Sequence, residues 1–359
     1  LQAAMQPVGT TSFIAASGAT SSVNTTAIAL GPAFGDAPQF AAALKSMAMF
    51  DSFGRDFGAD LSKRMIATPG TPDLFMAIQQ RLGWHGTGVS LDGTTSLAYN
   101  VRKNPEDGLV PFGATGGLPS SEMQHQAMFR LTGAARGLSW TAGSGLSLAD
   151  ALSPDRDADP FAMASITRSF SASVSNAPAA FATLSMPLES GSRLSFGVSQ
   201  AADLGTTNHP RTPFHNGEQS VAMRLDDRDG DVRFGFELGA MIEEYGLLGT
   251  MTAGGLKMTD RASTAWTTLT AEADLAAHWT LRASLTGAAT GATTPGNSLI
   301  AAIGPVYATS FSLGLAREEL FGHGDALSFA VGQPLRAEHA SLTLASATGL
   351  DPSTGDLVM

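Results

Sequence analysis

Apolar side chains alternate with small or polar ones along many short stretches of this chain, and this period of two constrains the fold more than any other feature. In residues 279–286 the odd positions carry Trp, Leu, Ala and Leu, and the even positions carry Thr, Arg, Ser and Thr. Successive side chains of a β-strand point to opposite faces, so the run predicts a strand with one apolar face. The same pattern recurs at 194–199, 232–239, 308–315, 327–332 and 341–344.

Turn-forming residues separate these runs, as at 189–192, 229–230 and 295–297. They leave room for roughly a dozen strands of about 8 to 10 residues, which is typical of a mid-sized up-and-down barrel. We therefore expect antiparallel strands to dominate residues 84–346, with helix well below the average of about a third.

The composition fits an exported chain and excludes several function classes. Charged residues make up 15 % of the 359 residues, against about 25 % in an average soluble domain, and the chain has 40 Gly and no Cys. A net charge of −11 argues against nucleic acid as a partner. Apolar runs stay below the roughly 18 residues that a transmembrane helix needs, whereas transmembrane strands need only alternation.

Two architectures can use this alternation. An outer-membrane barrel turns the apolar face to lipid and the small polar face to the lumen, whereas a soluble β-sandwich or β-roll buries the apolar face between sheets. Mid-strand charges suit both, and glycines on the polar face suit a lumen filled by a plug or helix. Four Trp and three Tyr are few for two aromatic girdles, and the end at Met359 lacks the terminal aromatic usual in such barrels. We favour the barrel, with its final strands missing.

In the barrel, we expect Phe311, Leu313, Phe329, Val331, Leu342 and Leu344 to face lipid. The charged residues Arg233, Glu237 and Arg282 are expected to face inward.

Residues 1–83 lack the repeated alternation of the later residues, and their pattern predicts a linker with some helix. The pattern of residues 84–359 predicts the β-domain. One short helix is expected over 36–49, with Pro38 in its first turn, and another over 71–82, which ends before Gly83. The first residues have neither the charged nor the apolar region of a secretory signal, so we expect any signal to lie outside this chain.

Three motifs stand at 1–10 (LQAAMQPVGT), 49–62 (MFDSFGRDFGADLS) and 324–336 (GDALSFAVGQPLR). In this order and spacing they resemble the exit of the catalytic domain, the segment after it and a strand near the C-terminus of Gram-negative subtilisin-like (S8 family) serine peptidases. The resemblance implies that the chain is the autotransporter-like region after the protease domain. It also implies that the parent protein is a serine endopeptidase whose nucleophile lies upstream.

No catalytic set is expected in the chain itself. The family's nucleophile lies in a G-T-S-x-A-x-P segment, and the nearest local string, 93–98, has an extra Thr and lacks the Pro, so Ser96 is not expected to be nucleophilic. No G-x-S-x-G elbow occurs either. The pair Glu243 and Glu244 indicates a strand end, because adjacent strand residues point to opposite faces.

We expect no metal ion or cofactor. The acidic run 226–231 fails the calcium-loop pattern, because Val232 stands where a Gly is required, and it fits a hairpin closed by Asp229 and Gly230 better. The seven histidines lack metal-ligand spacing, and the pair at 209 and 215 is interpreted as part of a surface loop.

Residues 51–60 interleave charges with phenylalanines and have two interpretations. They form either an edge strand or turn that packs its phenylalanines on the next domain, or a junction that seats the passenger against the β-domain.

The sequence thus predicts a non-catalytic β-domain that anchors or translocates an exported subtilisin-like peptidase at the outer membrane or cell surface. Its expected partners are its own protease domain, membrane lipid and, as an option, other copies of itself. The alternative is a soluble surface β-domain for adhesion, assembly or substrate binding.

Overall fold

A computed structural model describes residues 6–15, 18, 20–35, 37–67, 84–103, 125–144, 148–152, 170, 179–189, 191–201, 217–276, 278–320, 326–347, 349–350 and 357–358. Its main feature is a twelve-stranded antiparallel sheet in which each strand pairs with its neighbours in chain order. The expected all-β, up-and-down fold is therefore confirmed. The strands are β7 (Trp84–Ser90), β8 (Thr95–Lys103), β9 (His125–Ala135), β10 (Leu138–Ser144), β11 (Ala180–Pro187), β12 (Arg193–Ala201), β13 (Gly217–Asp229), β14 (Val232–Glu244), β16 (Arg261–Ala276), β17 (Trp279–Thr290), β19 (Val306–Glu318) and β20 (Ala326–His339).

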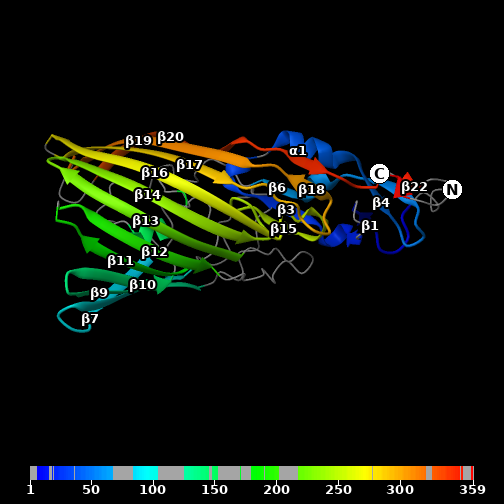
Figure 1. The fold of residues 1–359 in the computed structure, drawn as a ribbon. Helices are drawn as coiled ribbons and strands as arrows, with labels where there is room; N and C mark the ends of the chain where they lie inside the picture. The colour runs from blue at the N-terminus through cyan, green and yellow to red at the C-terminus, as the bar shows by residue number, and fades with distance from the viewer. Residues whose placement is uncertain are drawn as a thin grey trace.

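The two ends of the sheet carry connections of different length (Figure 1). Short turns join β7 to β8, β9 to β10, β11 to β12, β13 to β14, β16 to β17 and β19 to β20 at one end, while the longer connections lie at the other. The β13–β14 hairpin turns tightly at Gly230, whose φ of 59° is a conformation that glycine adopts without strain. The hairpin predicted at Asp229 and Gly230 is confirmed.

The last strand, β20, lies at one edge of the sheet and β7 at the other. The pairing of β19 with β20 shifts register between Thr309 and Phe311, opposite the segment that contains Pro334. Proline has no N–H to donate, so edge strands and bulges are the places where a sheet tolerates it. No ladder between β20 and β7 occurs among the described residues.

The N-terminal residues form short elements that gather at the end with the long connections (Figure 1). One small sheet has the order β2-β1-β4-β5 and another the order β15-β3-β6, with β15 contributed by the β14–β16 connection. The strands are β1 (Ser12–Ile14), β2 (Thr20–Ser22), β3 (Ala27–Leu30), β4 (Met47–Phe50), β5 (Asp56–Ala59), β6 (Met65–Ala67) and β15 (Met251–Ala253). We call this assembly the cap.

Helix is short in the cap. The helix expected over 36–49 is only α1 (Pro38–Ala43), which begins at the proline and is followed by the 3-10 turn η4 (Leu44–Ser46) and then by β4. Other 3-10 turns are η2 (Val23–Thr25), η3 (Pro32–Phe34), η5 (Leu61–Arg64) and η8 (Gly254–Leu256). The helix expected over 71–82 lies outside the described residues.

The main hydrophobic core is centred on the cap and extends onto the inner side of the large sheet, where it includes residues such as Met241 and Trp266. Buried side chains of the N-terminal elements, such as Phe13, Ile28 and Leu44, belong to one cluster with buried residues of the long connections, such as Leu247 and Ile300. The cap is thus fixed to the sheet by apolar packing.

Two further strand pairs lie outside the large sheet. The strands β18 (Ile300–Ile303) and β21 (Leu342–Leu344) pair with each other, and β22 (Gly349–Leu350) pairs with β23 (Leu357–Val358).

The expectation for Leu342 and Leu344 was wrong. Both belong to β21 and are half-buried against the core cluster, so they do not face outward with the residues of the large sheet. The chain leaves the large sheet after β20, and two alternating leucines are too short a run to reveal that change of partner.

Candidate functional site

The two faces of the twelve-stranded sheet differ sharply in chemistry. We call the face that carries exposed large apolar side chains the outer face, and the other the inner face. On the outer face Phe311, Leu313, Phe329 and Val331 are exposed as predicted, Phe329 and Val331 to 66 % and 65 %. Other exposed apolar side chains on this face are Val198, Val221, Leu225, Phe234, Phe236, Leu238, Leu269, Leu275, Leu285 and Leu327.

The apolar part of the outer face runs obliquely across the hydrogen-bonded rungs. On β13 the exposed apolar residues are Val221 and Leu225, and the next outer residue toward the turn is Asp227. The rung through Leu225 continues through Phe236, Leu269, Leu285 and Phe311 to Gln333 on β20. On β20 the exposed apolar residues have already ended at Val331. A band of constant height crosses strands in this way when the strands are tilted relative to it.

Hydroxyl side chains join the strands on the inner face. Each of these pairs links neighbouring strands through two oxygens that lie 2.6 to 2.9 Å apart, and the pairs are Ser96–Thr132, Ser185–Ser195, Ser199–Ser220, Thr264–Thr290, Thr268–Thr286 and Ser284–Ser312. Such cross-strand pairs stabilise a sheet by a few tenths to about 1 kcal/mol each. These hydroxyl groups of the inner face are therefore paired with one another.

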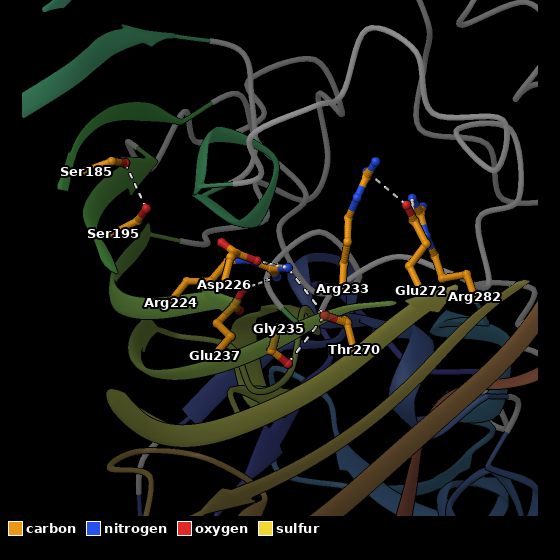
Figure 2. A network of polar contacts seen from close by, with 10 residues as sticks. All are labelled: Ser185, Ser195, Arg224, Asp226, Arg233, Gly235, Glu237, Thr270, Glu272 and Arg282. Carbon is orange, nitrogen blue, oxygen red and sulfur yellow. Dashed lines mark hydrogen bonds and ion pairs between the residues drawn. The ribbon is translucent and has the colours of Figure 1, made fainter. Parts of the chain in front are cut away.

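Charged residues form a network further along the inner face (Figure 2). Arg224 of β13 donates from Nε to Asp226 Oδ1 at 2.8 Å, and its Nη1 lies 3.7 Å from Oε2 of Glu237 on β14. Glu237 is only 1 % exposed, and its Oε1 accepts from the indole N–H of Trp266 at 2.9 Å. The indole donor and the guanidinium together compensate the burial of this carboxylate.

A second part of the network spans three strands. Glu272 of β16 accepts from Arg233 of β14 at 3.1 Å and from Nε of Arg282 of β17 at 2.8 Å. The prediction that Arg233, Glu237 and Arg282 face away from the apolar side is confirmed. Because two arginines share one glutamate, these polar groups fix one another across the sheet.

Within the β10–β11 connection, α3 (Leu148–Leu152) and Phe170 pack against the inner face. The helix α3 has buried leucines beside β12, where a Cβ on Gly197 would lie 2.7 Å from Leu148 Cδ1. Phe170, from the same connection, stacks on Trp266 with ring centroids 4.9 Å apart. The sequence expectation that inner-face glycines allow close approach by a plug is confirmed at Gly197.

Trp266 itself was missed by the sequence analysis, although a signal exists. It stands between Thr264 and Thr268 on the polar face of β16, opposite Gly239, where a Cβ would overlap the indole ring. A tryptophan on a polar face opposite a glycine indicates that something apolar covers that face.

The other residues singled out from the sequence occupy structural positions. Ser96 Oγ contacts only another hydroxyl, Thr132 Oγ1, which cannot act as a general base. Glu243 is buried and accepts from the backbone N–H groups of Leu248 and Gly249, whereas Glu244 is exposed, so the two carboxylates point apart as predicted.

The acidic run and the histidines bring no metal site together in the described ranges. No group of three or more His, Asp or Glu there could hold a metal ion. Asp226 pairs with Arg224, and Asp227 accepts from Ser192 Oγ at 2.8 Å. His209, His215 and His323 lie outside the described residues.

The segment 51–60 forms the turn and the second strand, β5, of the β4–β5 hairpin of the cap, and β5 is an edge strand of its sheet. Burial opposes ionisation of Asp51, but hydrogen bonds from Arg55 and from the backbone N–H groups of Arg55, Val8 and Phe53 hold its pKa at about 2. Arg55 Nη2 lies 2.6 Å from Asp51 Oδ2, and its guanidinium lies over the rings of Phe53 and Phe57. Phe53 is 74 % exposed, so the expectation that it packs on another domain is wrong within the described residues.

Comparisons with known proteins add little at the level of sequence. No protein-family model and no curated protein matches the chain. Among solved structures, OmpT (in-vitro folded), an outer membrane protein of Vibrio cholerae, matches with a TM-score of 0.37 at 10 % identity, covering 77 % of this chain and 84 % of that one. OccK2 (OpdF) of Pseudomonas aeruginosa gives 0.31 at 11 %, covering 74 % and 81 %, and OccK8 (OprE) gives 0.30 at 8 %, covering 70 % and 75 %. Structural similarity this low does not bear on function.

In the described part of the chain, no helix is long and apolar enough to cross a bilayer.

Proposed function

We propose that this chain is a β-domain embedded in the outer membrane, where it anchors an exported subtilisin-like serine peptidase. The observation that carries the membrane part is the exposed apolar outer face of the sheet. Large apolar side chains cover it from β12 to β20, whereas Glu237 and the hydroxyl pairs Ser199–Ser220 and Thr268–Thr286 are buried on the other face. Soluble monomers rarely expose continuous apolar patches above a few hundred Å². Exposing these apolar side chains to water is unfavourable, whereas contact with lipid makes the same arrangement stabilising.

The oblique apolar band supports the same proposal. A bilayer core is a planar slab of about 30 Å, and strands that cross it at a tilt of roughly 45° present 9 to 11 residues to it. On β19 the outer residues from Tyr307 to Arg317 span such a length. We propose that the sheet closes into a barrel around the β10–β11 connection, since closure removes the unpaired edges of β7 and β20 from lipid.

The anchoring part of the proposal depends on the resemblance and on where the cap lies. Of the three motifs, 49–62 includes the end of β4, all of β5 and part of η5, and 324–336 includes most of β20. In outer-membrane barrels the short turns face the periplasm and the long loops face the cell exterior. The cap lies at the end with the long connections (Figure 1). A protease domain preceding the cap would accordingly be held outside the cell.

Membrane extraction tests the first part of this proposal. Membranes carrying the chain should keep it through washes with high salt and alkaline buffer and release it only in detergent, and the released protein should change its gel mobility on heating. Release by salt or buffer would favour the alternative, a soluble surface β-domain.

Labelling tests the second part. In the parent protein with its protease domain, a serine-directed fluorophosphonate should label material in the membrane fraction, and removal of residues 84–359 should move the label to the medium. A label that stays in the membrane without the sheet would refute anchoring by this domain.

A further inference from the structure

Trp279 and Arg317 form a distinct pair on the outer face. Trp279 is the first residue of β17 and stands directly opposite Arg317 near the end of β19. The guanidinium carbon of Arg317 lies 5.5 Å from the centroid of the indole, within the range of a cation–π contact. The neighbour of Arg317 on its other side is the exposed Leu327 of β20.

One donor of the Arg317 guanidinium is unpaired within the described residues. Its Nε is buried and has no hydrogen-bond partner, and no acidic side chain of the described residues forms an ion pair with it. Two acidic residues directly follow Arg317 in the chain. Glu319 lies 3.5 Å from Nδ1 of His278, and Glu318 is directed to the opposite face by the alternation of the strand. Arg317 as a whole is only half-buried, so its terminal amino groups, and not the buried Nε, are the donors that an acceptor from outside the chain can reach.

The position of the pair identifies that acceptor. Along β19 the outer residues change from Phe311, Leu313 and Leu315 to Arg317 just before the turn, so the pair lies at the border of the apolar band. If the band spans the bilayer core, its border lies among the lipid headgroups. A phosphodiester there offers the oxygens that an arginine fork binds by charge-assisted hydrogen bonds, and an indole is favoured at the same depth.

We propose that Trp279 and Arg317 bind the phosphate group of a membrane lipid at the short-turn border of the sheet. This inference rests on the membrane-embedded function proposed above. The phosphate accepts from the Arg317 guanidinium, while the Trp279 ring holds the guanidinium against the sheet and lies beside the glycerol region of the lipid.

Retention of phosphatidylglycerol by the full chain tests this site. The wild type and three variants, Arg317→Gln, Trp279→Phe and Arg336→Gln, are transferred from phosphatidylcholine nanodiscs with and without phosphatidylglycerol into mild detergent. Native mass spectrometry then counts the bound lipid. Arg336 is a matched control because it is exposed on the outer face of β20, away from the short-turn border.

We expect the wild type and Arg336→Gln to retain one more phosphatidylglycerol than Arg317→Gln, and Trp279→Phe to retain it about tenfold more weakly. Equal retention by all four proteins, or displacement of the lipid by inorganic phosphate alone at equal concentration, would overturn the lipid site. A chain that does not enter nanodiscs and shows no heat-modifiable mobility would instead refute the proposed function, so the two failures are distinguishable.

Discussion

Replacing Leu313 with Arg separates the membrane-embedded β-domain from a soluble one. Leu313 lies in the middle of β19 with outer neighbours Phe311 and Leu315, and its side chain is 47 % exposed in the isolated chain. If the outer face contacts lipid, an arginine near the bilayer midplane should lower the free energy of unfolding by roughly 2 to 4 kcal/mol. If the face contacts water, a substitution at so exposed a position should change it by less than about 0.5 kcal/mol.

The assay is urea unfolding of the chain in phospholipid vesicles, followed by the loss of its heat-modifiable form. Thr309→Arg is the matched control, because Thr309 is exposed on the same face of the same strand, beyond Phe311 and toward the edge of the band. It should cost only about 0 to 1 kcal/mol, since the penalty for arginine falls toward the interface. A cost for Leu313→Arg no greater than that of Thr309→Arg would refute the assignment of this face to lipid.

Two further predictions concern packing on the inner face and pH in the cap. Gly239→Ala should lower the free energy of unfolding in urea by about 1 to 3 kcal/mol, because the added Cβ would overlap the Trp266 ring. Gly287→Ala is the control, since a Cβ there meets nothing within 4 Å and should cause no overpacking. Equal losses of stability in the two variants would refute the close packing at Trp266. The folded-state pKa of Asp51 is depressed from 3.8 to about 2, so the stability that it contributes should be complete above about pH 4 and lost as the pH falls toward 2. Limited proteolysis of the N-terminal segment should detect this loss in the wild type, and an Asp51→Asn variant that stays as resistant at neutral pH would contradict it.

The sequence predicted the large sheet well because its strands are long enough to show a period. Five or more alternating residues, as around Phe311 and Phe329, fix both the strand and the face that each side chain occupies. The strands of the cap have three or four residues, and β3 is buried throughout, so no alternation marks it. The prediction that Leu342 and Leu344 face outward was wrong for the same reason, since a short apolar run does not specify which strand it pairs with.

The features of the candidate site that escaped the sequence analysis depend on contacts between distant parts of the chain. Phe170 and Trp266 are separated in the chain by four strands of the large sheet, β11 to β14, and they meet because Phe170 lies on the inner face. The oblique course of the apolar band requires the register of every ladder, which periodicity within one strand does not give. The same holds for Trp279 and Arg317, whose pairing depends on the alignment of β17 with β19.

The location of the hydrophobic core links the fold to the proposed function. The buried apolar cluster is concentrated in the cap and the long connections, and it reaches the sheet through inner-face residues such as Met241 and Trp266. The outer leucines and phenylalanines of the sheet take no part in it and stay exposed. In water those side chains would contribute nothing to stability, whereas each one transferred to an apolar medium contributes up to about 1.5 to 3 kcal/mol. Under the proposed function, the cap therefore contains the core that is stable in water, and the outer face of the sheet is stabilised by contact with lipid.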